Sequence, residues 1–347
     1  MGNSTYIIGE IGQNHNGSVE LAKLLIEVSA RPVKDELFDV DLKPMDAVKL
    51  TKRDLKYELS NSQMASPYDN PNSFGKTYGE HREFLELSDE EHFECYKYAK
   101  ELVMDFVVTL CAPSCLSMLK LFTPDRLKVA SRDLTNLPLL EALAETKIPI
   151  VFSTGMGGKK EIDDAVELIG KYHNDIGILH CLSEYPSRYE NINLNTIKYL
   201  QEVYPQYTIG YSDHSIGISV PTAAVAMGAE IIEKHITIDR NMKGTDQKGS
   251  LSIDGIRRMV RDIRNIERSM GSKEIFVADA VKTAKNKLER SIASNKDLKK
   301  GQIITENDIH LLSPGDGFKW SAKDAVVGEK LNKDLLANEI IYPTILG

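Results

Sequence analysis

Residues 207–235 read YTIGYSDHSIGISVPTAAVAMGAEIIEKH. The apolar runs 207–210 and 230–233 both end in polar residues. Between these runs, Ser219 precedes an alanine-rich segment that stops at Gly228, which is typical of a helix. A strand, a helix and a second strand in this order predict two parallel strands whose carboxyl ends lie side by side.

The same alternation of short apolar runs and amphipathic stretches extends over most of the chain. The runs lie at 6–9, 46–50, 106–110, 127–130, 150–153, 176–179, 207–210 and 230–233. Largely apolar strands suit a parallel sheet that is covered on both faces, and eight of them suffice for a closed barrel. The last amphipathic helix should follow Ser252 and stop at Gly271. The sequence therefore predicts an α/β fold, a (β/α)8 TIM barrel over residues 1–271.

After residue 271 the alternation ends. Residues 272–288 are polar and lysine-rich, and we interpret them as a linker. Residues 289–347 contain a faint repeat, because Asp297-Leu298 and Asp334-Leu335 are each followed, six residues on, by a pair of isoleucines. This repeat predicts a small β-clip domain with approximate two-fold internal symmetry.

Two stretches of the barrel are longer than the alternation requires. Residues 31–43 lie where a short turn into the second strand would suffice. Residues 51–85 are polar, rich in Asn, Ser and Pro, and follow the carboxyl end of a strand. Because the active sites of such barrels lie at that end, we expect residues 51–85 to form part of a substrate lid.

The composition argues against several classes of function. The 347 residues carry a net charge of −8, which disfavours nucleic acid or an anionic membrane as the main partner. No apolar run approaches the roughly 20 residues that span a bilayer, and the first residues lack the basic and apolar regions of a signal peptide. The four cysteines are irregularly spaced, and we interpret them as reduced thiols. We therefore expect a cytoplasmic protein.

The polar residues at or just beyond the carboxyl ends of the predicted strands are the candidate site, because such residues face the substrate in TIM barrels. They are Glu10, Lys49, Lys128, Ser131, Arg132, Asp133, Ser153, Ser183, Tyr185, Ser212, His214 and His235. Among them, His214 and His235 end adjacent strands and should reach one ion. A single histidine is more often structural, but two at neighbouring strand ends indicate a metal site. With water and substrate oxygens they suit six-coordinate Mn²⁺ better than tetrahedral Zn²⁺.

A second group of these residues predicts an anion site. Lys49 and Lys128 supply positive charge, and the Ser-Thr-Gly turn at 153–155 allows backbone N–H groups to approach a phosphate or carboxylate. The alternative is that both lysines extend along the rim with their charges in water. The position of the turn at a strand end favours the anion site.

At these residues the sequence resembles the sialic acid synthase (N-acylneuraminate synthase) family. The similarity covers nearly the whole chain, in motifs at residues 8–17, 47–49, 134–138, 153–156, 180–181, 210–214, 233–237 and 244–246. Residues 289–347, with Ser-Pro-Gly-Asp-Gly at 313–317, are similar to the antifreeze-like domain of that family. The resemblance implies an enzyme that condenses phosphoenolpyruvate with an N-acylmannosamine-type aldose, giving a nonulosonic acid and phosphate.

The resemblance also implies roles for individual residues. Phosphoenolpyruvate would be bound by Lys49, Lys128, Ser153, Ser183 and Ser212. Three carboxylates would act on the sugar and its reacting oxygens as catalytic residues, Glu10, Asp133 and Asp246. His214 and His235 would hold Mn²⁺, with Mg²⁺ or Co²⁺ as alternatives. We add Ser131, Arg132 and Tyr185 to the substrate-binding residues. The family resemblance further implies a domain-swapped homodimer, in which the small domain of one chain covers the barrel of the other.

Three positions depart from the pattern of that family. Arg132-Asp133 replaces a glycine followed by an acidic residue, Ser313 replaces an arginine, and Cys111 lies in a run that usually reads Ser-Thr-Pro-Phe. We therefore expect the aldose to differ from N-acetylmannosamine at its acylamino position or to carry an anionic group. One alternative is a synthase for a non-acylated or atypical 3-deoxy-ulosonic acid. Another is an inactive sugar-binding scaffold, which would not need the complete set of charged residues.

Overall fold

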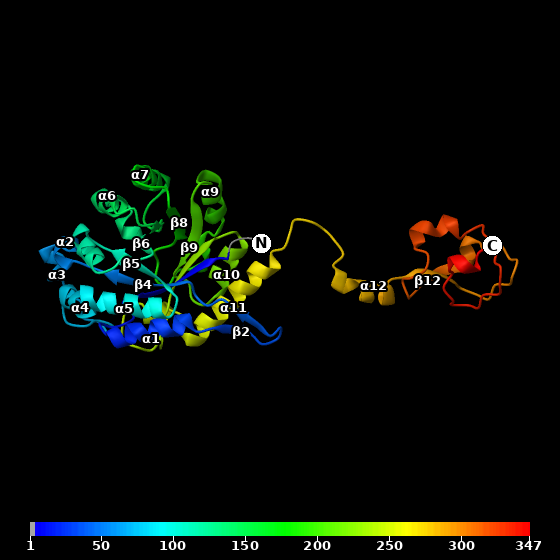
Figure 1. Ribbon diagram of the computed structural model, residues 1–347, viewed down its shortest axis with the longest axis horizontal. Coiled ribbons are helices and arrows are strands. Elements are labelled where there is room, and N and C mark those ends of the chain that lie inside the picture. The colour runs from blue at the N-terminus through cyan, green and yellow to red at the C-terminus, as the bar shows by residue number, and fades with distance from the viewer. Residues whose placement is uncertain (1–3) are drawn as a thin grey trace. The chain divides into compact units, whose positions relative to one another are not determined.

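The computed structural model describes residues 4–347 of the chain. It divides into two compact units, of which the first ends at Gly271 and the second spans Ser272–Gly347; each is described by itself (Figure 1). Within residues 4–347, no helix is both long and apolar enough to cross a bilayer. The four cysteines are buried and unpaired within the same residues.

Eight parallel strands close into a barrel in the order β1-β10-β9-β8-β7-β6-β5-β4. They are β1 (Tyr6–Gly12), β4 (Ala47–Lys52), β5 (Asp105–Leu110), β6 (Arg126–Val129), β7 (Ile150–Ser153), β8 (Ile176–Cys181), β9 (Thr208–Asp213) and β10 (Ile231–His235). Each coincides with one of the eight predicted apolar runs, so the barrel prediction is confirmed. At the closure, Glu10 lies beside His235 on one neighbouring strand and beside Lys49 on the other.

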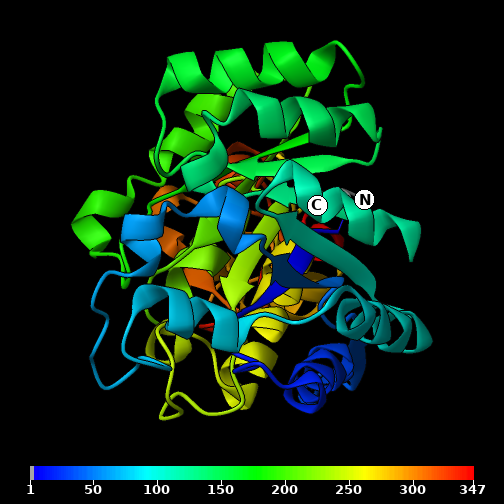
Figure 2. The same ribbon diagram turned by 90° about the vertical axis from the view of Figure 1, so that its left-hand side faces the viewer.

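Helices surround the sheet and cover its outer face (Figure 2). They are α1 (Val19–Ala30), α5 (Asp89–Glu101), α6 (Leu137–Glu145), α7 (Lys159–Gly170), α9 (Asn195–Val203), α10 (Ser219–Ala226) and α11 (Ile253–Ser269), with the 3-10 segment η1 (Pro113–Lys120) between β5 and β6. Side chains cap two of the helices at their predicted starts. Ser88 and Glu91 form a capping box at α5. The Ser18 side chain accepts a hydrogen bond from the Leu21 amide at α1.

The two long stretches contain further elements. Residues 31–43 form an antiparallel hairpin of β2 (Val33–Asp35) and β3 (Val40–Leu42). Residues 51–85 contain α2 (Leu55–Glu58), α3 (Asn61–Met64) and α4 (Tyr78–Leu85). Shorter segments follow other strands: η2 (Ser131–Asp133), α8 (Tyr189–Ile192) and η3 (Gln247–Gly249).

The second unit has its own small core. Its elements are η4 (Asp279–Val281), α12 (Lys282–Leu288), β11 (Ser291–Ser294), η5 (Glu306–Asp308), β12 (Ile309–Leu312), η6 (Trp320–Ala325) and η7 (Pro343–Ile345). The two predicted repeats meet at Leu298 and Leu335, whose backbones exchange hydrogen bonds of 2.8 and 2.9 Å. Residues 272–288, which we interpret as a linker, include α12, a lysine-containing helix with no buried residue.

Candidate active site

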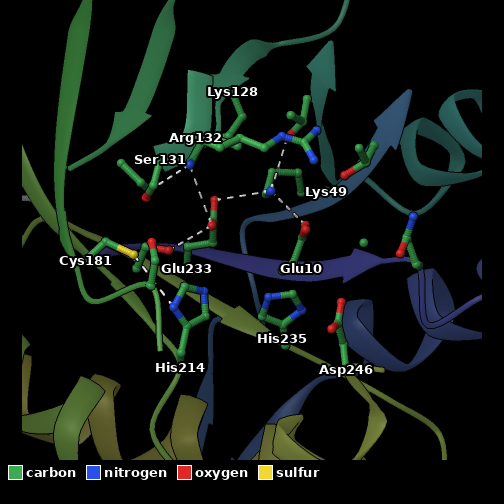
Figure 3. Close-up of a pocket in the computed structure, with 18 of the residues that line it drawn as sticks. Glu10, Lys49, Lys128, Ser131, Arg132, Cys181, His214, Glu233, His235 and Asp246 are labelled. Atoms are coloured by element: carbon green, nitrogen blue, oxygen red, sulfur yellow. Dashed lines mark hydrogen bonds and ion pairs between the residues drawn. The ribbon is translucent and has the colours of Figure 1, made fainter. Parts of the chain in front are cut away.

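One cavity of about 350 Å³ opens at the carboxyl ends of the barrel strands. Every residue that the sequence analysis assigned to the site lines it, with the exception of Asp133. Figure 3 shows the histidine pair on one side of this cavity, and Lys49 between two glutamates on the other. The topology therefore brings together side chains from all eight strands or the loops that follow them.

The floor of the cavity is polar because of strand alternation. Below it, six apolar side chains fill the interior of the barrel: Ile8, Ala47, Val107, Val151, Leu179 and Ile231. Side chains two residues apart on a strand point to the same side of the sheet. The residues that come two positions later on the same strands all line the cavity: Glu10, Lys49, Thr109, Ser153, Cys181 and Glu233.

Two buried lysines lie in this polar layer. The ammonium group of Lys49 is 3.0 Å from Glu10 Oε2 and 3.6 Å from Glu233 Oε2. Burial lowers the pKa of Lys49, but the two carboxylates more than offset it, so that the pKa is raised. Lys128 donates to Ser153 Oγ at 2.7 Å and lies 3.9 Å from Glu233 Oε1. Burial lowers the pKa of Lys128, and Glu233 only partly offsets this effect.

The two glutamates differ in their charge state. Burial raises the pKa of Glu10 to about 7, with the attraction of Lys49 opposing the rise and the charge of Glu233 adding to it. Burial also acts to raise the pKa of Glu233, but Lys128 and Lys49 hold that pKa well below its usual range. At neutral pH, Glu233 is therefore ionised, whereas Glu10 can exchange a proton.

Serine hydroxyl groups surround the lysines. Ser131 Oγ accepts a hydrogen bond of 3.1 Å from the Gly155 amide, and Ser212 Oγ donates one of 3.0 Å to Glu233. A Cβ atom on Gly155 would lie 2.4 Å from Ser183 Oγ and 3.0 Å from Ser131 Oγ. Glycine is thus required for the turn after β7 to approach these two serines, and the result is a compact cluster of donors that suits an anion.

The two histidines are suitably arranged for one divalent ion. The rings of His214 and His235 have centroids 5.5 Å apart. The Nδ1 atom of His214 lies 2.8 Å from the Leu182 carbonyl oxygen, which can only accept, so this nitrogen carries the proton and Nε2 keeps its lone pair. Burial lowers the pKa of His235, which favours its neutral, ligating form, and its buried Nδ1 has no hydrogen-bond partner. Within residues 4–347, no group of three or more His, Cys, Asp or Glu residues could hold a metal ion, so further ligands would be water or substrate.

Asp133 is the one predicted site residue that does not line the cavity in the described structure. Its carboxylate lies 3.2 Å from Nε of Arg132, and Asp133 is not among the residues that line the cavity. The cause is local, because residues 131–133 form a 3-10 turn that presents Ser131 and Arg132 instead. Arg132 is also paired with Glu58 at 3.0 Å, so its charge is largely neutralised.

Several lining residues were not predicted. They are Gly12, Gln13, Thr51, Arg53, Arg82, Thr109, Ala130, Met156, Cys181, Glu233 and Thr245. Glu233 could have been found, because it lies two residues before His235 and must share its face of the strand. Arg53 and Arg82 belong to the stretch 51–85, which therefore contributes directly to the cavity.

The chain matches known proteins over nearly its whole length. Residues 43–275 match the model of the NeuB family, and residues 289–346 match that of the SAF domain. The chain belongs to the NeuB family. It is 34% identical over 341 residues to the N,N'-diacetyllegionaminic acid synthase of Legionella pneumophila, covering 96% of this chain and 92% of the relative. Identity to the human N-acetylneuraminate-9-phosphate synthase is 32%, over 94% of this chain and 88% of the relative.

A solved structure shares the fold. The N-acetylneuraminic acid synthetase of Leptospira borgpetersenii, in complex with citrate, aligns with a TM-score of 0.67 at 30% identity, covering 81% of this chain and 90% of that chain. The resemblance to the sialic acid synthase family is thereby confirmed, and this NeuB family member is an enzyme of the synthase type.

Replacing Glu233 tests the charge state of the cavity floor. Glu233→Gln keeps the side-chain shape but removes the charge that faces both lysines. We expect the free energy of unfolding at pH 7 to fall by roughly 3 kcal/mol, because uncompensated buried charges are costly. The folded-state pKa is depressed below an unfolded value of about 4.3. The stabilisation is therefore fully present above that value and is lost as the pH falls toward the folded pKa. Urea denaturation at a series of pH values measures it.

Glu230→Gln is the matched control for this experiment. Glu230 is exposed just before the same strand, and its side chain forms no ion pair or hydrogen bond within the described chain. We expect its effect to stay within about 0.5 kcal/mol at every pH. A Glu233→Gln variant as stable as the wild type at pH 7 would contradict the assigned charges, as would a loss of stability that does not depend on pH.

Proposed function

We propose that this NeuB family member condenses phosphoenolpyruvate with an aldose to give a nonulosonic acid and phosphate. The observation that carries the proposal is the position of two buried lysines, Lys49 and Lys128, in the same cavity as the histidine pair. Two lysines beside a pair of histidines suit a reaction between an anionic enol ester and an aldehyde. The names of the relatives, which are synthases of such acids, support the same reaction. A sugar-binding scaffold would not need two buried lysines at this position.

Phosphoenolpyruvate would bind at the floor. Its phosphate and carboxylate would take charge-assisted hydrogen bonds from Lys49 and Lys128, and neutral ones from the hydroxyl groups of Ser153, Ser183 and Ser212. Ser153 already accepts a hydrogen bond from Lys128, so the two are preorganised to act together. The substrate anion would compete with Glu10 and Glu233 for the lysines. Binding thus replaces ion pairs within the chain by ion pairs to the substrate, and Glu10, whose pKa is about 7, can take up a proton when it loses Lys49.

His214 and His235 would hold the divalent ion, Mn²⁺ being the one we infer from two imidazoles completed by oxygen ligands. Such an ion would act as a Lewis acid toward the aldehyde oxygen of the open-chain sugar. Asp246 and Tyr185 line the same part of the cavity, and the Tyr185 ring lies 4.0 Å from that of His214. We assign both residues to binding and orienting the sugar.

The proposed bond changes require one proton acceptor and one proton donor. Carbon 3 of phosphoenolpyruvate forms a bond to the aldehyde carbon, and the aldehyde oxygen becomes a hydroxyl group that takes up a proton. Water then adds to carbon 2 and loses a proton. As the bond between carbon 2 and the phosphate oxygen breaks, the new hydroxyl group on carbon 2 becomes the carbonyl group and its proton passes to the departing phosphate. Glu10, whose pKa of about 7 lies close to neutral pH, is suited to give the first proton and to recover the second.

Metal removal tests the histidine site. We expect the enzyme to bind one Mn²⁺ per chain, measured by elemental analysis, and His214→Ala or His235→Ala to abolish that binding. Phosphate release from phosphoenolpyruvate in the presence of aldose should fall on the order of a hundredfold or more, because a Lewis acid contributes several kcal/mol. His173→Ala, which lies before β8 and outside the cavity, is the control and should bind metal normally. Full activity after exhaustive chelation would refute the metal proposal.

Gly155 provides a steric test of the anion site. In Gly155→Ala, the new methyl group would displace Ser183 and Ser131, so we expect the KM for phosphoenolpyruvate to rise about tenfold, which corresponds to the loss of one or two hydrogen bonds. Gly249→Ala is the matched control, because no atom lies within 4 Å of its added Cβ. The control should keep the wild-type KM. An unchanged KM in Gly155→Ala would show that this serine cluster does not bind the substrate.

A further inference from the structure

One of the cationic side chains that line the cavity differs from the others in the groups that it contacts. Five lysine and arginine side chains line the cavity: Lys49, Arg53, Arg82, Lys128 and Arg132. All of them except Arg82 have a glutamate carboxylate within 4.0 Å. Within residues 4–347, Arg82 forms no ion pair. Among these five cations, Arg82 is therefore the one without an ion pair to a residue of the described chain.

Neutral groups hold the Arg82 side chain in place. Its Nη1 donates to Gln13 Oε1 and its Nη2 donates to the Tyr78 hydroxyl group, both at 2.6 Å. The guanidinium carbon lies 4.8 Å from the centroid of the Tyr78 ring. The Nε atom of Arg82 is buried and has no hydrogen-bond partner. The guanidinium group is thus oriented in advance, while Nη1 and Nη2 each keep a second N–H group that can donate to an anion.

Arg82 belongs to a different part of the fold from the two lysines. Lys49 and Lys128 belong to barrel strands, whereas Arg82 belongs to α4 in the stretch 51–85. Its partner Gln13 follows the end of β1 at Gly12, beyond the floor residue Glu10. A sugar whose aldehyde lies near the floor would extend its other end toward this outer position. We therefore assign the anion at Arg82 to the sugar and not to the phosphoenolpyruvate at the floor.

We propose that Arg82 binds a phosphate monoester on the terminal carbon of the aldose, so that the substrate of this enzyme is a phosphorylated sugar. This inference rests on the proposed function. Guanidinium groups bind phosphate through parallel hydrogen bonds, and their charge is retained at any pH of interest. Condensation adds three carbons at the aldehyde, so carbon 6 of a hexose becomes carbon 9 of the product. Of the relatives, the human enzyme is named for a 9-phosphate and the Legionella enzyme is not, so the names alone do not decide.

The structure also moves the expected anion site from Arg132 to Arg82. The sequence suggested Arg132, because it replaces a glycine beside the sugar pocket. In the folded chain, Glu58 and Asp133 both lie within ion-pair distance of Arg132, and its Nη2 contacts Cys111 Sγ at 3.0 Å. A guanidinium that is already paired with two carboxylates offers little to a further anion.

The test compares two sugars in the complete enzyme. Phosphate release would be measured with phosphoenolpyruvate, Mn²⁺, and either N-acetylmannosamine or its 6-phosphate, with the product identified by mass spectrometry so that simple phosphatase activity is excluded. We expect kcat/KM to be at least about tenfold higher for the phosphorylated sugar. Arg82→Met should remove about tenfold to hundredfold of that value, mainly through KM, since a charge-assisted contact is lost. The kcat/KM for the unphosphorylated sugar should fall much less than that for the phosphorylated one, so that the preference between the two sugars is lost.

Two further variants complete the experiment. Arg82→Lys keeps the charge and should retain part of the preference. Lys76→Met removes an exposed cation of the same stretch, whose side chain has no partner within the described residues, and should retain all of it. Equal kcat/KM for both sugars in the wild type would overturn the inference, as would a preference that survives in Arg82→Met. Failure to consume either sugar would instead contradict the proposed function. If Arg82→Met does not fold, the wild-type preference and the Arg82→Lys variant decide.

Discussion

Two lysine side chains lie inside the barrel, and their need for counter-charges constrains the arrangement around them. Lys49 and Lys128 are only 4% and 2% exposed, and an ammonium group at such a depth is costly unless it is paired. The compensating carboxylates, Glu10 and Glu233, come from β1 and β10, the two strands that join the ends of the sheet. The pairing of β1 with β10 and β4, which closes the barrel, therefore also brings the two carboxylates next to the lysines. These ion pairs stabilise the cavity floor.

Successive side chains of β10 point to opposite faces of the sheet, so that some face the cavity and others stabilise the barrel from outside. Glu233 and His235 point into the barrel, whereas Lys234, between them, points outward and is fully buried against Asp213 at a distance of 2.5 Å. Asp213 also accepts hydrogen bonds of 2.9 and 3.0 Å from the amide and hydroxyl groups of Ser215, which fixes the backbone just after His214. The outward ion pair thus ties together the two strand ends that carry the histidines. We assign it a positioning role, since neither charge faces the cavity.

The sequence was sufficient for the architecture and for most of the floor of the site, because both depend on strand periodicity. The apolar runs mark the strands, and parallel closure places all their carboxyl ends at one edge, so Lys49, Lys128 and the histidines could be grouped without coordinates. Asp133 does not line the cavity, because a 3-10 turn decides where its side chain points and three residues of sequence do not specify that turn; its catalytic role stays a prediction. Arg82 was missed for a different reason. It reaches the cavity through tertiary contacts with Gln13 and Tyr78, and no periodic pattern connects these residues.

The floor and the outer part of the cavity are built from different kinds of structure, and this division separates reaction from selectivity. Residues of the floor lie on strands whose register and packing tolerate little change, as expected for groups that must hold a reacting anion in one geometry. The outer residues Arg53 and Arg82 come from the stretch 51–85, whose three short helices lie outside the barrel repeat. Loops of a barrel accept substitution more readily than its strands. A change in this stretch can therefore alter the outer part of the cavity while the residues of the floor stay as they are.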